Sequence, residues 1–189
     1  IGCVQTALAD QYVVARFVGH SGPILEADFG ERIRRIASGS RDGTLRLWAE
    51  SGEPLWVLEQ GGAVVRTRFS RDERLILAVI ARGTTEVARA FDLDGTMLAE
   101  VGGDRPLSAA DWDPDGTRVL ARYADGAGGI ALLDRSGSVV TELLPESEDG
   151  TVQFSPDGHA LHLTSRTVSI WPVDGGASIE LRADRVAPF

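Results

Sequence analysis

A repeat of about 42 residues runs through the chain and restricts its fold more than any other feature. Short apolar runs end in an aromatic residue at spacings of 40, 43 and 42 residues, at Phe29, Phe69, Trp112 and Phe154. A second anchor follows about 20 residues later, at Trp48, Phe91, Leu133 and Trp171. Four pairs of anchors on one period predict four copies of a single structural unit.

Each unit contains four short runs that alternate between apolar and polar residues, which is the pattern of β-strands with one more apolar face. The connections carry pairs such as Asp42-Gly43, Ser51-Gly52 and Asp94-Gly95, whose glycines supply the positive φ that tight hairpins require. Strands of this length at this spacing predict an all-β chain built from four-stranded antiparallel sheets.

A sheet with two apolar faces must be covered by another sheet on each side. A propeller provides this cover, because its sheets stand side by side in a ring as blades. We therefore expect a single propeller segment over residues 1–189, with about 4.5 blades, belonging to a larger or incomplete ring. The predicted units are a half blade at 1–18 and blades at 19–59, 60–101, 102–145 and 146–189. The alanines and glutamine of the half blade would also suit a helix. Because the chain begins inside a predicted strand, we expect it to be part of a longer polypeptide.

Several short motifs stand at fixed places in the units. The first unit has Gly19-His20, then the run ending at Phe29, then IASGSRDGTLRLW, which ends at Trp48. The third and fourth units carry WDPDG (112–116) and FSPDG (154–158). These motifs resemble those of the WD-repeat β-propeller family, in a degenerate, bacterial-type form. The resemblance covers essentially the whole chain and implies a scaffold that binds proteins.

The resemblance also implies a structural tetrad in the first unit, formed by His20, either Ser38 or Ser40, Asp42 and Trp48. Such buried polar groups must satisfy one another, and a closed network would tie the strands of one blade together. The same residue types could be a catalytic Ser-His-Asp triad, but no strained nucleophile turn accompanies either serine. Phe91 and Leu133 lack an indole N–H, and no His precedes the second, third or fourth unit. These three blades are therefore expected to rest on apolar packing alone.

No metal or cofactor site is expected from the sequence. His159 and His162 are three residues apart in a strand-like run and would point to opposite faces. Asp113, Asp115 and Asp157 could be imagined as calcium ligands, although a repeated hairpin turn explains them as well.

The turns between the second and third strands carry Arg41, Arg82, Asp125 and Arg166, and Arg105 lies in the segment that leads into the third blade. The resemblance places these positions on the face most often used for partners. Three arginines brought together there would attract carboxylate or phosphate groups. They could equally be solvated turn residues.

Composition limits the functions further. The net charge of -9 disfavours nucleic acid and anionic membranes as partners. All 19 basic residues are arginine, so Schiff-base chemistry and a phosphate-loop lysine are excluded within these residues. No apolar run is long enough to span a membrane. The absence of lysine and asparagine suggests a GC-rich, bacterial genome, and the single Cys3 fits a cytoplasmic location.

The leading hypothesis is a non-catalytic scaffold or sensor module that binds a protein partner or neighbouring domains of its own polypeptide. The alternative is a propeller enzyme or cofactor-binding domain, of the calcium-dependent hydrolase or quinone dehydrogenase type. An incomplete ring would leave strand edges and apolar blade faces open, which predicts self-association.

Overall fold

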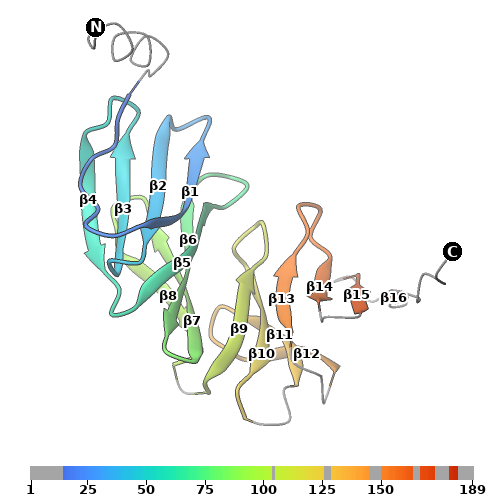
Figure 1. The fold of residues 1–189 in the computed structure, drawn as a ribbon. Coiled ribbons are helices and arrows are strands. Elements are labelled where there is room, and N and C mark those ends of the chain that lie inside the picture. The colour runs from blue at the N-terminus through green and yellow to red at the C-terminus, as the bar shows by residue number, and fades with distance from the viewer. Residues whose placement is uncertain are drawn as a thin grey trace, which may run out of the picture.

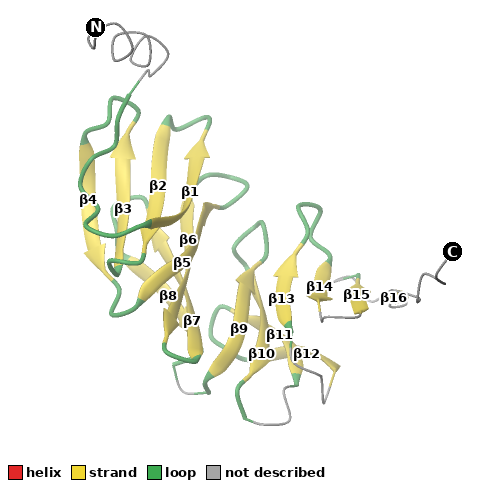
Figure 2. Cartoon of the chain, viewed as in Figure 1, coloured by secondary structure: helices red, strands yellow, loops and turns green. Residues whose placement is uncertain are grey.

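The computed structural model describes residues 15–103, 105–125, 129–144, 150–163, 167–172 and 179–182. Within these ranges all regular secondary structure is β-strand (Figure 2). None of the described residues forms a helix that could cross a membrane. The all-β fold class predicted from the repeat is therefore confirmed.

The strands fall into four consecutive groups of four, which we call blades 1 to 4. Blade 1 contains β1 (Ile24–Gly30), β2 (Arg35–Ser40), β3 (Thr44–Ala49) and β4 (Pro54–Glu59). Blade 2 contains β5 (Ala63–Phe69), β6 (Leu75–Arg82), β7 (Thr85–Asp92) and β8 (Met97–Val101). Blade 3 contains β9 (Leu107–Trp112), β10 (Arg118–Tyr123), β11 (Ile130–Asp134) and β12 (Val139–Leu144). Blade 4 contains β13 (Thr151–Phe154), β14 (Ala160–Leu163), β15 (Thr167–Trp171) and β16 (Ile179–Arg182).

Within each blade, strands that are consecutive in the sequence pair in antiparallel fashion. Blades 2 and 3 are additionally joined by one ladder pair, between Glu86 and Leu107. The blades follow one another in an open arc, with blade 1 and blade 4 at its two ends (Figure 1). This arrangement is a propeller segment whose sheets do not close into a ring. The exact unit boundaries expected from the sequence stay a prediction.

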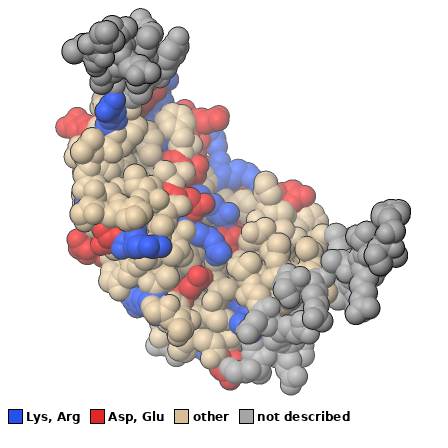
Figure 3. Space-filling model, viewed as in Figure 1, with Lys and Arg blue, Asp and Glu red and all other residues tan. Residues whose placement is uncertain are grey.

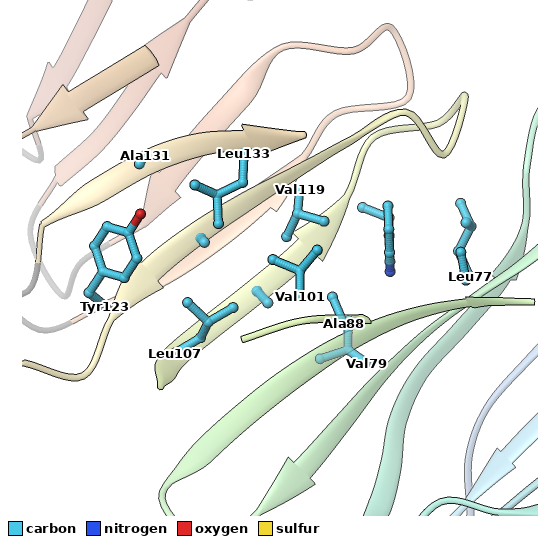
Figure 4. Packing of buried hydrophobic residues seen from close by; sticks show 13 residues of the cluster. Leu77, Val79, Ala88, Val101, Leu107, Val119, Tyr123, Ala131 and Leu133 are labelled. Carbon is cyan, nitrogen blue, oxygen red and sulfur yellow. The ribbon is translucent and has the colours of Figure 1, made fainter. Parts of the chain in front are cut away.

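Apolar side chains fill the space between successive blades. Ala37, Leu45 and Leu47 of blade 1 meet Val64 and Ile76 of blade 2. A second cluster, between blades 2 and 3, includes Leu77, Val79, Leu107, Val119 and Leu133 (Figure 4). A third, between blades 3 and 4, includes Leu120, Ile130, Leu132, Val152 and Phe154. Each blade is therefore held by the burial of apolar area against its neighbour.

Gly39 lets blade 1 approach blade 2 closely. A Cβ atom at this position would lie 2.5 Å from the Cγ1 atom of Val64 and 3.0 Å from its carbonyl oxygen. Since no real side chain tolerates such contacts, only glycine allows β2 to pack against β5 at this distance.

Aspartates on the first strands of blades 1 and 3 accept hydrogen bonds from the backbone of the next blade. Asp28 accepts the N–H of Phe69 at 2.7 Å, and Asp111 accepts the N–H of Phe154 at 2.7 Å. Asp111 also pairs with Arg68 at 3.1 Å. One backbone N–H at the end of β5 and one at the end of β13 are thus satisfied by a carboxylate of the preceding blade.

Further bonds of the same kind join the blades at neighbouring positions. Glu26 accepts the N–H of Thr67 at 2.7 Å, and Glu86 accepts the N–H of Ala110 at 2.8 Å. Burial raises the pKa of Glu86, and the hydrogen bond from Ala110 and the charge of Arg66 oppose that effect. Hydrogen bonds are directional, so these contacts fix how one blade is aligned on the next.

Aspartates organise the hairpin turns, in agreement with the turn interpretation of the sequence. The Oδ1 atom of Asp113 accepts the N–H of Thr117 at 2.7 Å. Asp157 accepts the hydroxyl of Ser155, and its carboxylate lies 3.2 Å from the Nδ1 atom of His159. These side chains are used by the turns that contain them.

The half blade expected at residues 1–18 is not seen in the part that the structure describes. Residues 1–14 lie outside the described residues, and residues 15–20 form no strand. This segment instead crosses blade 1 (Figure 1), where Phe17 packs edge-on against Trp48 with ring centroids 5.9 Å apart. Phe17 therefore covers part of blade 1 near Trp48, and the half blade stays a prediction because most of its residues lie outside the described part of the chain.

We expect Asp111→Ala to lower the free energy of unfolding by about 2 to 3 kcal/mol, because it leaves the N–H of Phe154 without its acceptor and Arg68 without its partner. Asp115→Ala is the matched control, since Asp115 is 58 % exposed and only pairs with Arg71 at 3.5 Å. Urea denaturation should show a shift within about 0.5 kcal/mol for the control. Equal shifts for the two variants would contradict the role of Asp111.

Candidate functional site

A buried polar network occupies blade 1. The Nδ1 atom of His20 lies 3.0 Å from the Oδ2 atom of Asp42, and its Nε2 atom lies 2.7 Å from the Oγ atom of Ser38. The indole N–H of Trp48 donates to the same Ser38 oxygen at 2.8 Å. The side chains of His20 and Asp42 are 3 % and 6 % exposed. The four groups form one chain of hydrogen bonds that reaches from the His20 segment to β3.

The structure decides between the two serines that the sequence left open. Ser38 is the hydroxyl that links His20 to Trp48. The hydroxyl of Ser40 instead donates to the backbone carbonyl of Pro23 at 2.9 Å and accepts the N–H of Asp42 at 3.1 Å. Ser40 therefore holds the β2–β3 turn against the start of β1.

Thr44 is a further member of the network that sequence reasoning missed. Its hydroxyl donates to Asp42 at 2.7 Å and lies 2.9 Å from the Nδ1 atom of His20. The signal was present in the sequence, because a hydroxyl residue two positions after a turn aspartate commonly bonds to it.

Hydrogen bonds hold Asp42 in its charged form. Burial raises the pKa of Asp42, but the Thr44 side chain, the backbone N–H groups of Thr44 and Ser21, and His20 together hold that pKa well below its usual range. The carboxylate thus acts as the fixed acceptor at one end of the network.

The network has the connectivity of a structural support. Ser38 is 3 % exposed, and its oxygen already accepts from Trp48 while it is bonded to His20. A nucleophile needs open space beside its oxygen for a substrate and donors for the charge that develops there. The contacts of Ser38 are those of the tetrad.

The equivalent positions in blades 2 and 3 are apolar. The pairing of Ile36 with Trp48 in blade 1 corresponds to that of Ile76 with Phe91 in blade 2 and of Val119 with Leu133 in blade 3. On this alignment Ala78 and Ala121 stand where Ser38 stands in blade 1, and both are fully buried. Apolar packing therefore replaces the network in these two blades.

The predicted partner-binding residues lie at one end of the blades, where the β2–β3, β6–β7 and β10–β11 turns and the segments between blades meet. Arg41 and Arg82 are exposed there. Arg82 reaches the backbone carbonyl of Gln60 at 3.5 Å. Arg166 lies outside the described residues. We call Arg41, Arg82, Arg105 and Asp125 the turn rim.

Arg105 and Asp125 form an ion pair within the turn rim, with the Nη2 and Oδ2 atoms 2.5 Å apart. The guanidinium of Arg105 also lies over the ring of Tyr123, 3.2 Å from its centroid. Asp125 therefore neutralises Arg105, which is one of the predicted partner-binding residues. On the face drawn in Figure 3, acidic and basic side chains are interspersed.

The candidate metal ligands lie apart. His159 is in the β13–β14 turn and contacts Asp157, whereas His162 is in β14 and 3 % exposed. Among the residues that the structure describes, no group of three His, Cys, Asp or Glu side chains could hold a metal ion.

Comparison with known families agrees with this architecture. The family model described as "WD domain, G-beta repeat" matches residues 11–49, which include the tetrad. The chain belongs to the WD-repeat family. The match ends at Ala49, directly after Trp48, and the later blades continue the same strand pattern.

Three proteins similar to this chain come from eukaryotes. The chain is 30 % identical over 158 residues to "Eukaryotic translation initiation factor 3 subunit I" of Emericella nidulans, a match that covers 75 % of this chain and 46 % of that protein. The protein of the same name from Schizosaccharomyces pombe is 38 % identical over 90 residues, covering 44 % of this chain and 27 % of its own length.

A third relative is the "Ribosome biogenesis protein BOP1 homolog" of Oryza sativa subsp. japonica, which is 39 % identical over 67 residues, covering 34 % of this chain and 10 % of that protein. The chain spans less than half the length of these curated relatives. They give no support to the bacterial and sensor interpretations of the sequence.

A double-mutant cycle tests the tetrad. Because Trp48 donates to Ser38, we expect Ser38→Ala and Trp48→Phe to be coupled by about 1 kcal/mol in the free energy of unfolding. Ser40→Ala is the matched control, since Ser40 makes no bond to Trp48, and its effect should add to that of Trp48→Phe. Strong coupling of Ser40, or additivity for Ser38, would show that the network is connected differently.

Asp42→Asn tests the charge in the network through pH. A depressed pKa in the folded protein means that the charged carboxylate stabilises the fold above about pH 4, and this contribution is lost as the pH falls further. We expect the variant to be less stable than the parent by on the order of 2 kcal/mol at pH 7. Denaturation curves between pH 7 and pH 3 should show the difference shrinking below about pH 4. A constant difference would contradict the assignment.

Proposed function

We propose that this WD-repeat chain is a non-catalytic protein-interaction scaffold. The proposal rests on one observation. The buried polar side chains of the tetrad in blade 1 are all hydrogen-bonded to one another, while the neighbouring turns present charged side chains to solvent. Loops on a rigid frame are suited to recognition, because the frame keeps their side chains in place without a partner.

The relatives suggest where such a scaffold works. Proteins named as subunit I of eukaryotic translation initiation factor 3 match up to 75 % of this chain. We propose that this chain has a related role, as one component of a protein assembly in translation initiation. That role would place it in the cytoplasm, with other proteins or other parts of its own polypeptide as partners.

We propose the turn rim as the surface that meets the partner. Arg41 and Arg82 offer exposed guanidinium groups, and Arg105 is 54 % exposed beside Asp125. Planar guanidinium groups bind carboxylates with two parallel hydrogen bonds, so acidic side chains of a partner fit these positions. Arg166 is included in this proposal from its place in the repeat.

Self-association through open faces stays a prediction. Phe29, Leu55 and Val57 of blade 1 are 46 %, 44 % and 44 % exposed, which is unusual for large apolar side chains in a sheet.

Charge reversal tests the turn rim. In pull-downs from a eukaryotic extract, with initiation-factor subunits quantified by mass spectrometry, the combined variant Arg41→Glu, Arg82→Glu and Arg166→Glu should recover them at least about tenfold less. Arg82→Glu and Arg74→Glu form a matched pair, because they change the net charge equally. Arg74 is 85 % exposed at the opposite end of β6 and should have no effect. Unchanged recovery by the combined variant would reject the turn rim, and absence of initiation factors from the parent sample would reject the role in translation.

A further inference from the structure

Blade 1 and blade 4 lie at the two ends of the arc (Figure 1), and each has one face that no other described blade covers. We call the face of a blade toward the preceding blade its leading face, and the opposite face its trailing face. The two uncovered faces are therefore the leading face of blade 1 and the trailing face of blade 4. Both carry apolar side chains at positions that are buried in the junctions between blades.

The leading face of blade 1 exposes an aromatic residue that the other blades bury. Phe29 of β1 is 46 % exposed. The residues at its position in blades 2, 3 and 4 are only 7 %, 1 % and 6 % exposed, because each packs in the cluster shared with the preceding blade; they are Phe69, Trp112 and Phe154. The position is thus built to be covered by a trailing face.

Two residues of β4 extend this apolar surface. Trp56 and Leu58 pack toward blade 2, so the alternation of the strand puts Leu55 and Val57 on the leading face. Leu55 and Val57 are each 44 % exposed. The segment that crosses blade 1 packs Phe17 against Trp48 and leaves these side chains in solvent.

The trailing face of blade 4 shows the complementary difference. In blade 1, Ala37 and Leu47 pair across β2 and β3 and are fully buried against blade 2. The corresponding pairs in blades 2 and 3 are at most 2 % exposed; they are Leu77 with Ala90 and Leu120 with Leu132. In blade 4 the pair is Leu161 with Ile170, and both are only partly buried. Neither belongs to any of the three apolar clusters between blades.

A polar contact recurs at every junction, from the residue directly before the aromatic position. Asp28 accepts the N–H of Phe69, Arg68 pairs with Asp111, and Asp111 accepts the N–H of Phe154. In blade 4 this residue is Gln153, which is exposed. A carboxamide can accept or donate, so blade 4 offers to a following blade the same kind of contact that the three inner junctions use.

We propose that two copies of this chain associate head to tail, with the leading face of blade 1 of each copy on the trailing face of blade 4 of the other. Each new junction would then repeat the apolar contacts that join blades 1 to 2, 2 to 3 and 3 to 4. The proposal does not depend on the translation role or on the turn rim.

A second copy is the occupant that these observations favour, because it presents both halves of a junction that the chain already forms three times. Contacts between two different patches leave no patch open only when the assembly closes into a ring. Propeller rings hold about four to eight blades, so two copies with the four described blades each reach the upper end of that range.

The mass of the parent chain in solution is the first test. Sedimentation velocity and light scattering on the full chain should both give the mass of two copies, and dilution should release single copies. A mass of one copy at every concentration would overturn the proposal, as would a mass above two copies.

Two variants test the head-to-tail arrangement. Phe29→Arg puts a charge on the leading face and Ile170→Arg puts one on the trailing face, and since every junction uses both faces, each variant alone should associate at least about tenfold more weakly. An equal mixture should regain the mass of two copies, because the intact trailing face of one variant meets the intact leading face of the other. Such recovery also establishes that both variants are folded.

The opposite outcomes are equally defined. If Ile170→Arg alone kept the mass of two copies, the leading faces would be pairing with each other, and the proposal would be overturned. Failure of the mixture to associate, with both variants folded by circular dichroism, would overturn it as well. Leu98→Arg is the matched control, because Leu98 is 51 % exposed but lies on β8 of blade 2, which has a blade on each side. This variant should keep the mass of two copies.

Discussion

Each blade of this chain is stabilised by the blade beside it. The buried side chains of β2, β3, β6, β10 and β11 face another sheet, and the three apolar clusters all lie between successive blades. A single four-stranded sheet of this size could not bury two apolar faces by itself. Burial between blades is therefore the interaction on which strand order, spacing and the open arc depend.

Apolar burial has no direction, so something else must align one blade on the next. The carboxylates of Asp28 and Asp111 do this, because each accepts a specific backbone N–H of the following blade. Arg68 of blade 2 forms an ion pair with Asp111 of blade 3. Gly39 sets how closely the first two blades approach. Together these contacts make a stiff frame, and a stiff frame allows its turns and cavities to recognise partners without rearrangement.

The interior of blade 1 differs from that of blades 2 and 3. Blade 1 uses the network of His20, Ser38, Asp42 and Trp48, whereas Ala78 and Ala121 make blades 2 and 3 apolar at the equivalent place. The proposed turn rim offers guanidinium groups that suit acidic side chains of a partner.

The sequence by itself determined the all-β fold class, because period-two alternation, turn glycines and spaced aromatic anchors are local properties of the chain; the tetrad residues followed from the family resemblance. Only the tertiary structure showed that Ser38, and not Ser40, bonds to Trp48, and that Thr44 belongs to the same network. It also showed the ion pair between Arg105 and Asp125 and the contact of Phe17 with Trp48. These features depend on distances between residues far apart in the chain, which are set by how the blades pack and which no local pattern records.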